Sequence, residues 1–120
     1  MNLKECIENF DSAVSDGDKA IFKTTEKMGL TAFHHGAGRW IRNECNLWRD
    51  GTKEIQDGIQ KILDTGYEIQ AINNLLEQRL KADESDVIDY SLDHPDNASG
   101  VILDLYHDYL NGKFDLSLLD

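Results

Sequence analysis

The chain has 120 residues, of which 40% are hydrophobic and 29% are charged, proportions ordinary for a single soluble domain with a modest core. Its formal net charge is −11, which disfavours nucleic acid as a direct ligand because phosphate neutralisation needs clustered Lys and Arg. No apolar run approaches the roughly 20 residues that span a bilayer, so we expect no membrane segment. The N-terminus lacks the apolar block of a signal peptide, and this predicts a cytoplasmic protein.

The N-terminal part of the sequence has the apolar spacing of two short helices. The first is predicted over residues 3–14 and the second over residues 19–27, with Asp18 as its N-cap. In the second helix we expect Ile21 and Phe22 to face inward.

The next segment, residues 33–48, holds two His, two Arg, two Trp and two Gly, the highest density of chemically useful residues in the sequence. Its apolar residues recur mostly at steps of three, four and seven, which predicts one helix. On such a helix His34, Gly38 and Arg42 share one face. Gly36 and Gly38 each cost about 1 kcal/mol relative to Ala inside a helix, so they indicate close approach by a partner helix or a ligand.

Two further helices are predicted over residues 53–63 and 67–81, followed by a polar loop at 82–86. Residues 87–90 fit either a short strand or one helical turn, because periodicity cannot decide over four residues.

The last helix has the clearest limits. It is predicted to begin at residues 93–96, where Pro95 suits a first turn and acidic residues suit the helix dipole, and to end at Asn111 and Gly112. The whole sequence, residues 1–120, is therefore predicted to be a single all-α domain, an irregular bundle of five or six helices.

The two cysteines, Cys6 and Cys45, both occupy helical positions among apolar residues. They form neither a metal-binding spacing nor a disulfide framework, so we expect two buried free thiols.

Two blocks of the sequence bear a family resemblance. The first is HHGAGRWIRN at residues 34–43 followed by Leu47 and Trp48, and the second is HPDNASG at residues 94–100 followed by Ile102 and Leu103. They resemble the hallmark blocks of a family of small bacterial proteins catalogued as a domain of unknown function. Its approximate pattern is H-x-G-x-G-x-W-I-R-N-x-x-x-L-W and then H-P-D-x-x-S-x-x-I-L.

The resemblance implies a shared site and no particular activity. Between the two blocks this sequence is longer than the family pattern, as though a helical hairpin were inserted over residues 49–88. The polar residues that match the two blocks are His34, Arg42, Asn43, His94, Asp96 and Ser99.

If the blocks meet in space, two interpretations of that site are open. His34, Arg42, His94 and Asp96 can bind an anion at a helix N-terminus, with one His as general base and Asp96 orienting it. Alternatively, Arg42 pairs with Asp96 and the cluster is a structural clamp between two helices. In both interpretations Arg42 should lie within hydrogen-bonding reach of residues 94–96, because a guanidinium beside the core needs acceptors.

Other chemistry is less well supported. Asp104 and His107 lie three apart, as in the metal sites of helical bundles, but no other helix repeats that spacing. There is no phosphate-binding Gly-rich loop and no activated nucleophile. We therefore expect neither a metal nor a cofactor, and the sequence does not establish an enzymatic activity.

Small size, the acidic charge and the lack of a complete catalytic motif predict an interaction protein with a basic protein partner. A concrete form is an immunity protein or inhibitor that neutralises a basic toxin or nuclease by direct binding. The alternative is a small hydrolase that acts on an anionic, phosphate-bearing substrate at the His34, Arg42, His94 and Asp96 cluster.

Overall fold

The computed structural model describes residues 1–48, 51–82 and 91–120, and within these residues the fold is helical with no strand. The prediction of an all-α fold is confirmed, although five or six helices is too low a count once 3-10 segments are included. The described elements are six α-helices and two 3-10 helices: α1 (Leu3–Ala13), α2 (Asp16–Thr24), η1 (Lys27–Phe33), α3 (Ala37–Glu44), α4 (Gly51–Asp64), α5 (Gln70–Lys81), α6 (Pro95–Leu110) and η2 (Leu116–Leu119).

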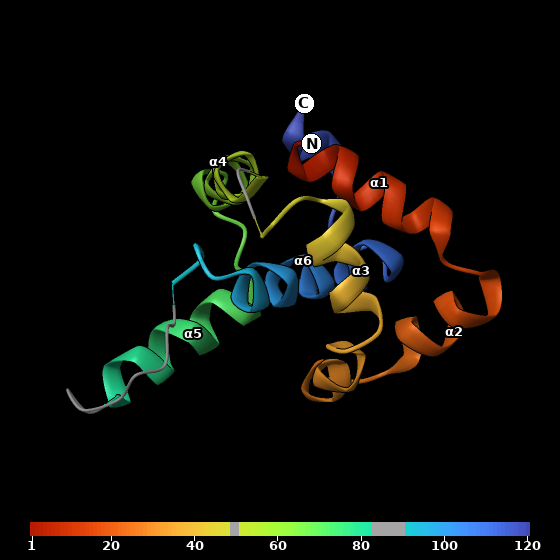
Figure 1. Cartoon of the computed structure of the whole chain (residues 1–120), viewed down its shortest axis with the longest axis horizontal. Helices are drawn as coiled ribbons and strands as arrows, with labels where there is room; N and C mark the ends of the chain where they lie inside the picture. The colour runs from red at the N-terminus through yellow and green to blue at the C-terminus, as the bar shows by residue number, and fades with distance from the viewer. Residues whose placement is uncertain (49–50, 83–90) are drawn as a thin grey trace.

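Helix α6 is the centre of the fold, and the other helices pack around it (Figure 1). All residues from Val101 to Asp108 are buried, so this helix has no solvent face over two turns. Its limits are as predicted, since Pro95 occupies the first turn and Gly112 follows the helix in the left-handed region with φ of 72°.

Helix α1 packs against α4, and both termini lie at this side of the molecule (Figure 1). Asn2 caps α1 in a reciprocal capping box with Glu5. The two helices approach closely at Gly58, where a Cβ atom would lie 2.6 Å from the Cβ of Leu3. The C-terminal tail is held there by Lys61, whose Nζ donates to the carbonyl of Asp120 at 2.7 Å.

The second predicted helix is displaced in register. Helix α2 begins at Asp16 with Ser15 as its N-cap, so the expected cap at Asp18 is wrong. Phe22 is buried as predicted, but Ile21 is 59% exposed. A helix of nine residues offers only a narrow inward face, and Phe22 occupies it against Tyr106 of α6.

The predicted single helix over residues 33–48 is also wrong. The backbone forms η1, turns at residues 34–36 and begins α3 only after Gly36, which serves as an N-cap without a side-chain bond. Glycine favours such a break, since it is a poor helix former. The break lets Phe33 pack on Phe22, with 4.8 Å between ring centroids.

Cys6 of α1 and Cys45 after α3 form a disulfide, with their Cα atoms 5.8 Å apart. Both side chains are buried as expected, but the prediction of free thiols is wrong. The bond closes across a sequence separation of 39 residues, and no local spacing pattern reveals such a pair.

The described parts of residues 49–88 form α4 and α5, which pack chiefly on different elements. Helix α4 contacts α1, η2 and α6, whereas α5 contacts α6 and extends away from the core (Figure 1). The inserted hairpin over 49–88 stays a prediction.

On α5, Leu76 and Leu80 match the apolar spacing but are exposed, because no described element covers the distal turns. Residues 83–90, including the expected strand or turn, lie outside the described residues.

Among the described residues, no helix combines the length and the hydropathy needed to cross a membrane.

Reducing the Cys6–Cys45 bond should lower the stability of the protein. Loop-closure entropy gives about 4 kcal/mol for a loop of this length. Urea unfolding followed by circular dichroism, with and without dithiothreitol, measures the loss, and Cys6→Ser should behave like the reduced protein. Identical unfolding curves for the oxidised and reduced protein, together with two titratable thiols in the oxidised sample, would show that the bond is absent.

Candidate functional site

Arg42 of α3 is the most highly connected side chain of the two motif blocks. It is only 5% exposed, and its guanidinium donates to the Oγ of Ser99 and to the carbonyl of His34, both at 3.0 Å. Its Nε also lies 3.5 Å from Oδ1 of Asp96. The prediction that Arg42 reaches the 94–96 turn is therefore confirmed, and the two blocks meet in space. We call this group, Arg42 with His34, Asp96 and Ser99, the arginine clamp.

The second block supplies the α6 side of the clamp. Nδ1 of His94 accepts the backbone N–H of Asp96 at 3.1 Å and so caps α6. Ser99 accepts from Arg42 and donates its hydroxyl to the carbonyl of Asp96 at 3.0 Å. The Ser99 hydroxyl is thus engaged both as an acceptor and as a donor. It could act as a nucleophile only if these hydrogen bonds were broken.

Not every residue of the first block lies where the sequence predicts. His34 precedes α3 and shares no helix face with Arg42, which it instead meets through the turn at residues 34–36. Asn43 is exposed and accepts from the indole of Trp48, so it stands outside the clamp. Gly38 makes room for Arg42 itself, because a Cβ there would lie 3.0 Å from the guanidinium.

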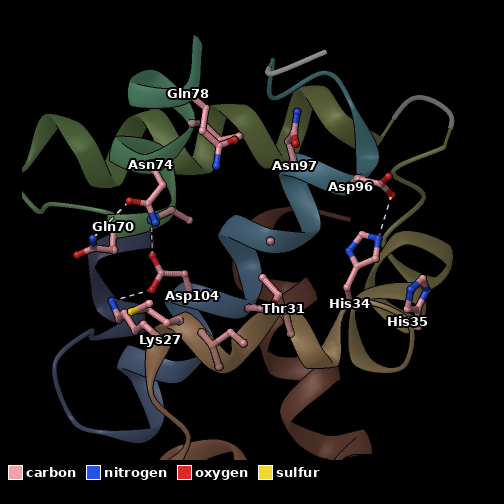
Figure 2. Close-up of a pocket in the computed structure, with 16 residues that line it drawn as sticks. Lys27, Thr31, His34, His35, Gln70, Asn74, Gln78, Asp96, Asn97 and Asp104 are labelled. Atoms are coloured by element: carbon pink, nitrogen blue, oxygen red, sulfur yellow. Dashed lines mark hydrogen bonds and ion pairs between the residues drawn. The ribbon is translucent and has the colours of Figure 1, made fainter. Parts of the chain in front are cut away.

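Beside the clamp is an open pocket of about 540 Å³ between η1, α5 and α6, which we call the groove (Figure 2). Figure 2 shows His34 and Asp96 at one end and Lys27 with Asp104 at the other. Apolar side chains from all three elements also line it, and carboxamides from α5 form one wall. The labelled polar residues in Figure 2 are Lys27, Thr31, His34, His35, Gln70, Asn74, Gln78, Asp96, Asn97 and Asp104.

The α5 wall is the part of the site that sequence reasoning missed. Polar residues spaced four apart on a helix ordinarily indicate a solvent face, and no sequence signal distinguishes a groove wall from such a face.

The far end of the groove contains a second ion cluster, which we call the lysine network. Nζ of Lys27 lies 2.7 Å from Asp104 and 2.9 Å from Asp108, and both carboxylates are almost fully buried. Asp104 also accepts the backbone N–H of Ala71 at 2.8 Å, which ties the start of α5 to α6. Asp108 accepts the hydroxyl of Tyr67. One ammonium therefore faces two carboxylates, and the trio carries a net negative charge.

The lysine network shifts two pKa values upward. Burial lowers the pKa of the Lys27 ammonium, but the hydrogen bonds to Asp104 and Asp108 and the negative charges of these carboxylates together outweigh burial, and the net pKa is raised. Burial and the bond to Asp108 both raise the pKa of Tyr67 above its ordinary value. Both groups hold their protons more strongly in the folded protein than in the unfolded protein.

The Asp104 and His107 pair considered for a metal is engaged in protein contacts instead. Nε2 of His107 lies 2.7 Å from the carbonyl of Thr25, which can only accept, so this nitrogen carries the proton. Asp104 contacts Lys27 and Ala71. No group of three or more potential ligands of a metal ion is found among the described residues.

The charged side chains near the groove differ in how far protein contacts already engage them. Arg42 and Lys27, the two permanent cations at the ends of the groove, are both occupied by protein acceptors. Asp96 keeps 44% of its side chain exposed, and Nε2 of His34 lies 3.8 Å from its Oδ1. The fold and site define a small all-helical protein with an open, partly acidic groove between two structural ion clusters.

The chain belongs to the family described as a domain of unknown function, DUF6794, whose model matches residues 1–61. The matched region contains the first motif block and ends before the second. Searches among curated proteins and among solved structures find no match to this sequence.

Replacing Arg42 by Ala should destabilise the fold by about 2–4 kcal/mol, because Ser99, Asp96 and the carbonyl of His34 all lose a donor. Arg39→Ala is the matched control on the same helix, since Arg39 is exposed, and it should change stability by no more than about 0.5 kcal/mol. Urea unfolding monitored by circular dichroism measures both variants. Equal stabilities for the two would show that the clamp contributes nothing.

The lysine network predicts a loss of stability at alkaline pH. The pKa values of Lys27 and Tyr67 are raised on folding. Their contribution to the free energy of unfolding is therefore complete below the pKa values of the unfolded protein, near 10, and it is lost as pH rises through the pKa values of the folded protein. Above about pH 10 the slope should be steeper for the native sequence than for Tyr67→Phe, by up to about 1.4 kcal/mol per pH unit.

Tyr109→Phe is the control for this pH series, because it removes a phenol that makes no hydrogen bond with Asp108, which accepts from Tyr67 instead. Chemical unfolding at pH 9, 10 and 11 provides the measurement. Parallel curves for the native sequence and Tyr67→Phe would contradict the proposed linkage.

Proposed function

We propose that this chain is an interaction protein that binds a basic protein partner, with the groove as its binding surface. The observation that carries the proposal is the charge state of the groove. Lys27 in the groove is neutralised by Asp104 and Asp108, and Arg42 beside it is paired with Asp96, whose carboxylate nevertheless stays 44% exposed. A cationic side group entering the groove therefore meets a partly exposed carboxylate, and no free ammonium or guanidinium competes with it among the described residues that line the groove.

The charge of the whole sequence supports the same partner. The net charge is −11, and residues 82–112 contain eight acidic residues and no Lys or Arg. Such a field steers a basic partner toward the protein and accelerates association at low ionic strength.

A concrete form of this function is an immunity protein or inhibitor that neutralises a basic toxin or nuclease. The small size of the protein and the structural use of Arg42 and Ser99 support this form over catalysis. We also infer that the resemblance to a two-block family extends beyond the matched residues, because the second block supplies Asp96 and Ser99 to the clamp.

The redox state of the two cysteines bears on the compartment in which the protein works. A disulfide such as Cys6–Cys45 is typical of oxidising compartments, which opposes the cytoplasmic location expected from the sequence. In the cytoplasm we expect the same pair to remain as two buried thiols. The proposed binding holds in either case, since neither cysteine lines the groove.

The alternative function is a small hydrolase acting on an anionic substrate. One observation favours it, namely that His34 and Asp96 lie beside each other at the edge of the groove, as a base and its orienting carboxylate would. Against it, an anionic substrate would meet Asp96 and Asp104 with no free permanent cation among the described residues that line the groove. Release of p-nitrophenol from p-nitrophenyl phosphate, abolished by His34→Ala, would favour this alternative.

A peptide library tests the proposed function. Fluorescence anisotropy with labelled 12-residue peptides should show binding of Lys-rich and Arg-rich members and none of Glu-rich members, with association slowing markedly from 20 mM to 500 mM salt. Asp96→Asn should weaken binding by about 3- to 10-fold.

Asp93→Asn is the matched control, since it makes the same charge change three positions earlier, at an exposed residue outside the groove. It should leave affinity within about twofold of the native value. Binding that is indifferent to peptide charge and to salt would overturn the electrostatic basis of the proposal.

A further inference from the structure

One wall of the groove is a regular row of carboxamides. Gln70, Asn74 and Gln78 lie four residues apart on α5, and all three line the groove (Figure 2). Four residues of α-helix rise about 6 Å, so the row, which we call the amide ladder, repeats at that interval over about 12 Å.

This interval is close to the repeat of an extended peptide. A strand rises about 3.3 Å per residue, so backbone groups that face the same way recur about every 6.6 Å. Each carboxamide offers both a donor and an acceptor, the complement of a backbone carbonyl and a backbone N–H. Three rungs of the ladder therefore match alternate residues over a segment of about five.

The carboxamides are available for such bonds. The amide of Gln70 donates to Asn74 only at the 3.5 Å limit of a hydrogen bond, which leaves most of the bonding capacity of both groups unused. Gln78 has no hydrogen bond or ion pair with the described residues. All three side chains belong to exposed residues.

The floor of the groove has room for a side group of the ligand. Gly100 of α6 lines the groove, and a Cβ placed there would meet no atom within 4 Å. Leu75 and Leu103 also line the groove and give it apolar surface. The floor therefore accepts a ligand side group while the wall addresses the ligand backbone.

We propose that the groove binds an extended peptide segment of the partner, with its backbone on the amide ladder and a Lys or Arg side group at Asp96. The inference rests on the proposed function, because it specifies how the basic partner is held. A helical ligand fits the observations less well, since its backbone is bonded internally and would leave the three carboxamides unpaired.

An N-methyl scan of the peptide tests this arrangement. The probe is the tightest-binding Lys-containing 12-residue peptide of the library, methylated at one backbone nitrogen at a time. We expect losses of about tenfold or more at alternate positions over about five residues, and less than about threefold at the positions between them.

Variants of the protein test the same contacts from the other side. Asn74→Ala should weaken binding about 5- to 10-fold. Asn73→Ala is the matched control, because it removes the same side chain from the neighbouring exposed position outside the groove, and it should change affinity less than about twofold. Gly100→Ala should weaken binding while thermal melting shows an intact fold, since its methyl group occupies only open space.

The outcomes separate the two proposals. Three results overturn the extended mode while basic peptides still bind, and they leave the proposed function in place. In the N-methyl scan, these are losses of affinity that recur every three or four positions, or losses that are equal at all positions. In the variants, the result is an equal loss of affinity for Asn73→Ala and Asn74→Ala. A library in which no basic peptide binds overturns both.

Discussion

The burial of one guanidinium organises this structure. Arg42 lies between α3 and α6 with almost no access to water, and an unpaired charge at such a position would cost several kcal/mol. Three features of the fold follow from that constraint. Gly38 leaves space beside the guanidinium, the turn at residues 34–36 aims a carbonyl at it, and α6 begins where Asp96 and Ser99 can reach it. The two motif blocks are thus the two halves of one contact.

The groove depends on this contact at one end and on the lysine network at the other. The clamp sets the position of η1 and the start of α6, while Asp104 holds the first turn of α5 through Ala71. Because the cations Lys27 and Arg42 are each engaged by acceptors of their own cluster, the two clusters serve as supports, and the surface between them is left for a ligand. Leu76 and Leu80, both exposed on the outer turns of α5, extend apolar surface beyond the groove.

The parts of the fold that were predictable from the sequence are those that local chemistry determines. Pro95 and Gly112 mark the ends of α6 because each has a backbone preference that few other residues share. The reach of Arg42 was predictable from the cost of burying a guanidinium. The break before α3 was not predictable, because apolar periodicity continues across Gly36 whether that glycine lies inside a helix or caps one.

The remaining wrong predictions concern contacts between distant segments. Cys6 and Cys45 look like core residues individually, and only the packing of α1 on α3 brings them together. The amide ladder resembles any solvated helix face until η1 and α6 are placed opposite it.

The groove, supported by the two ion clusters, is the surface that we propose meets the partner. The most direct measurement is a titration of the ¹⁵N-labelled protein with the tightest-binding basic peptide, followed by amide chemical shifts. The largest shifts should fall on Thr31, Asn74 and Gly100, with the side-chain amides of Gln70 and Gln78 moving as well. Shifts concentrated around Asn43 and Trp48, with those groove signals unchanged, would contradict the proposal.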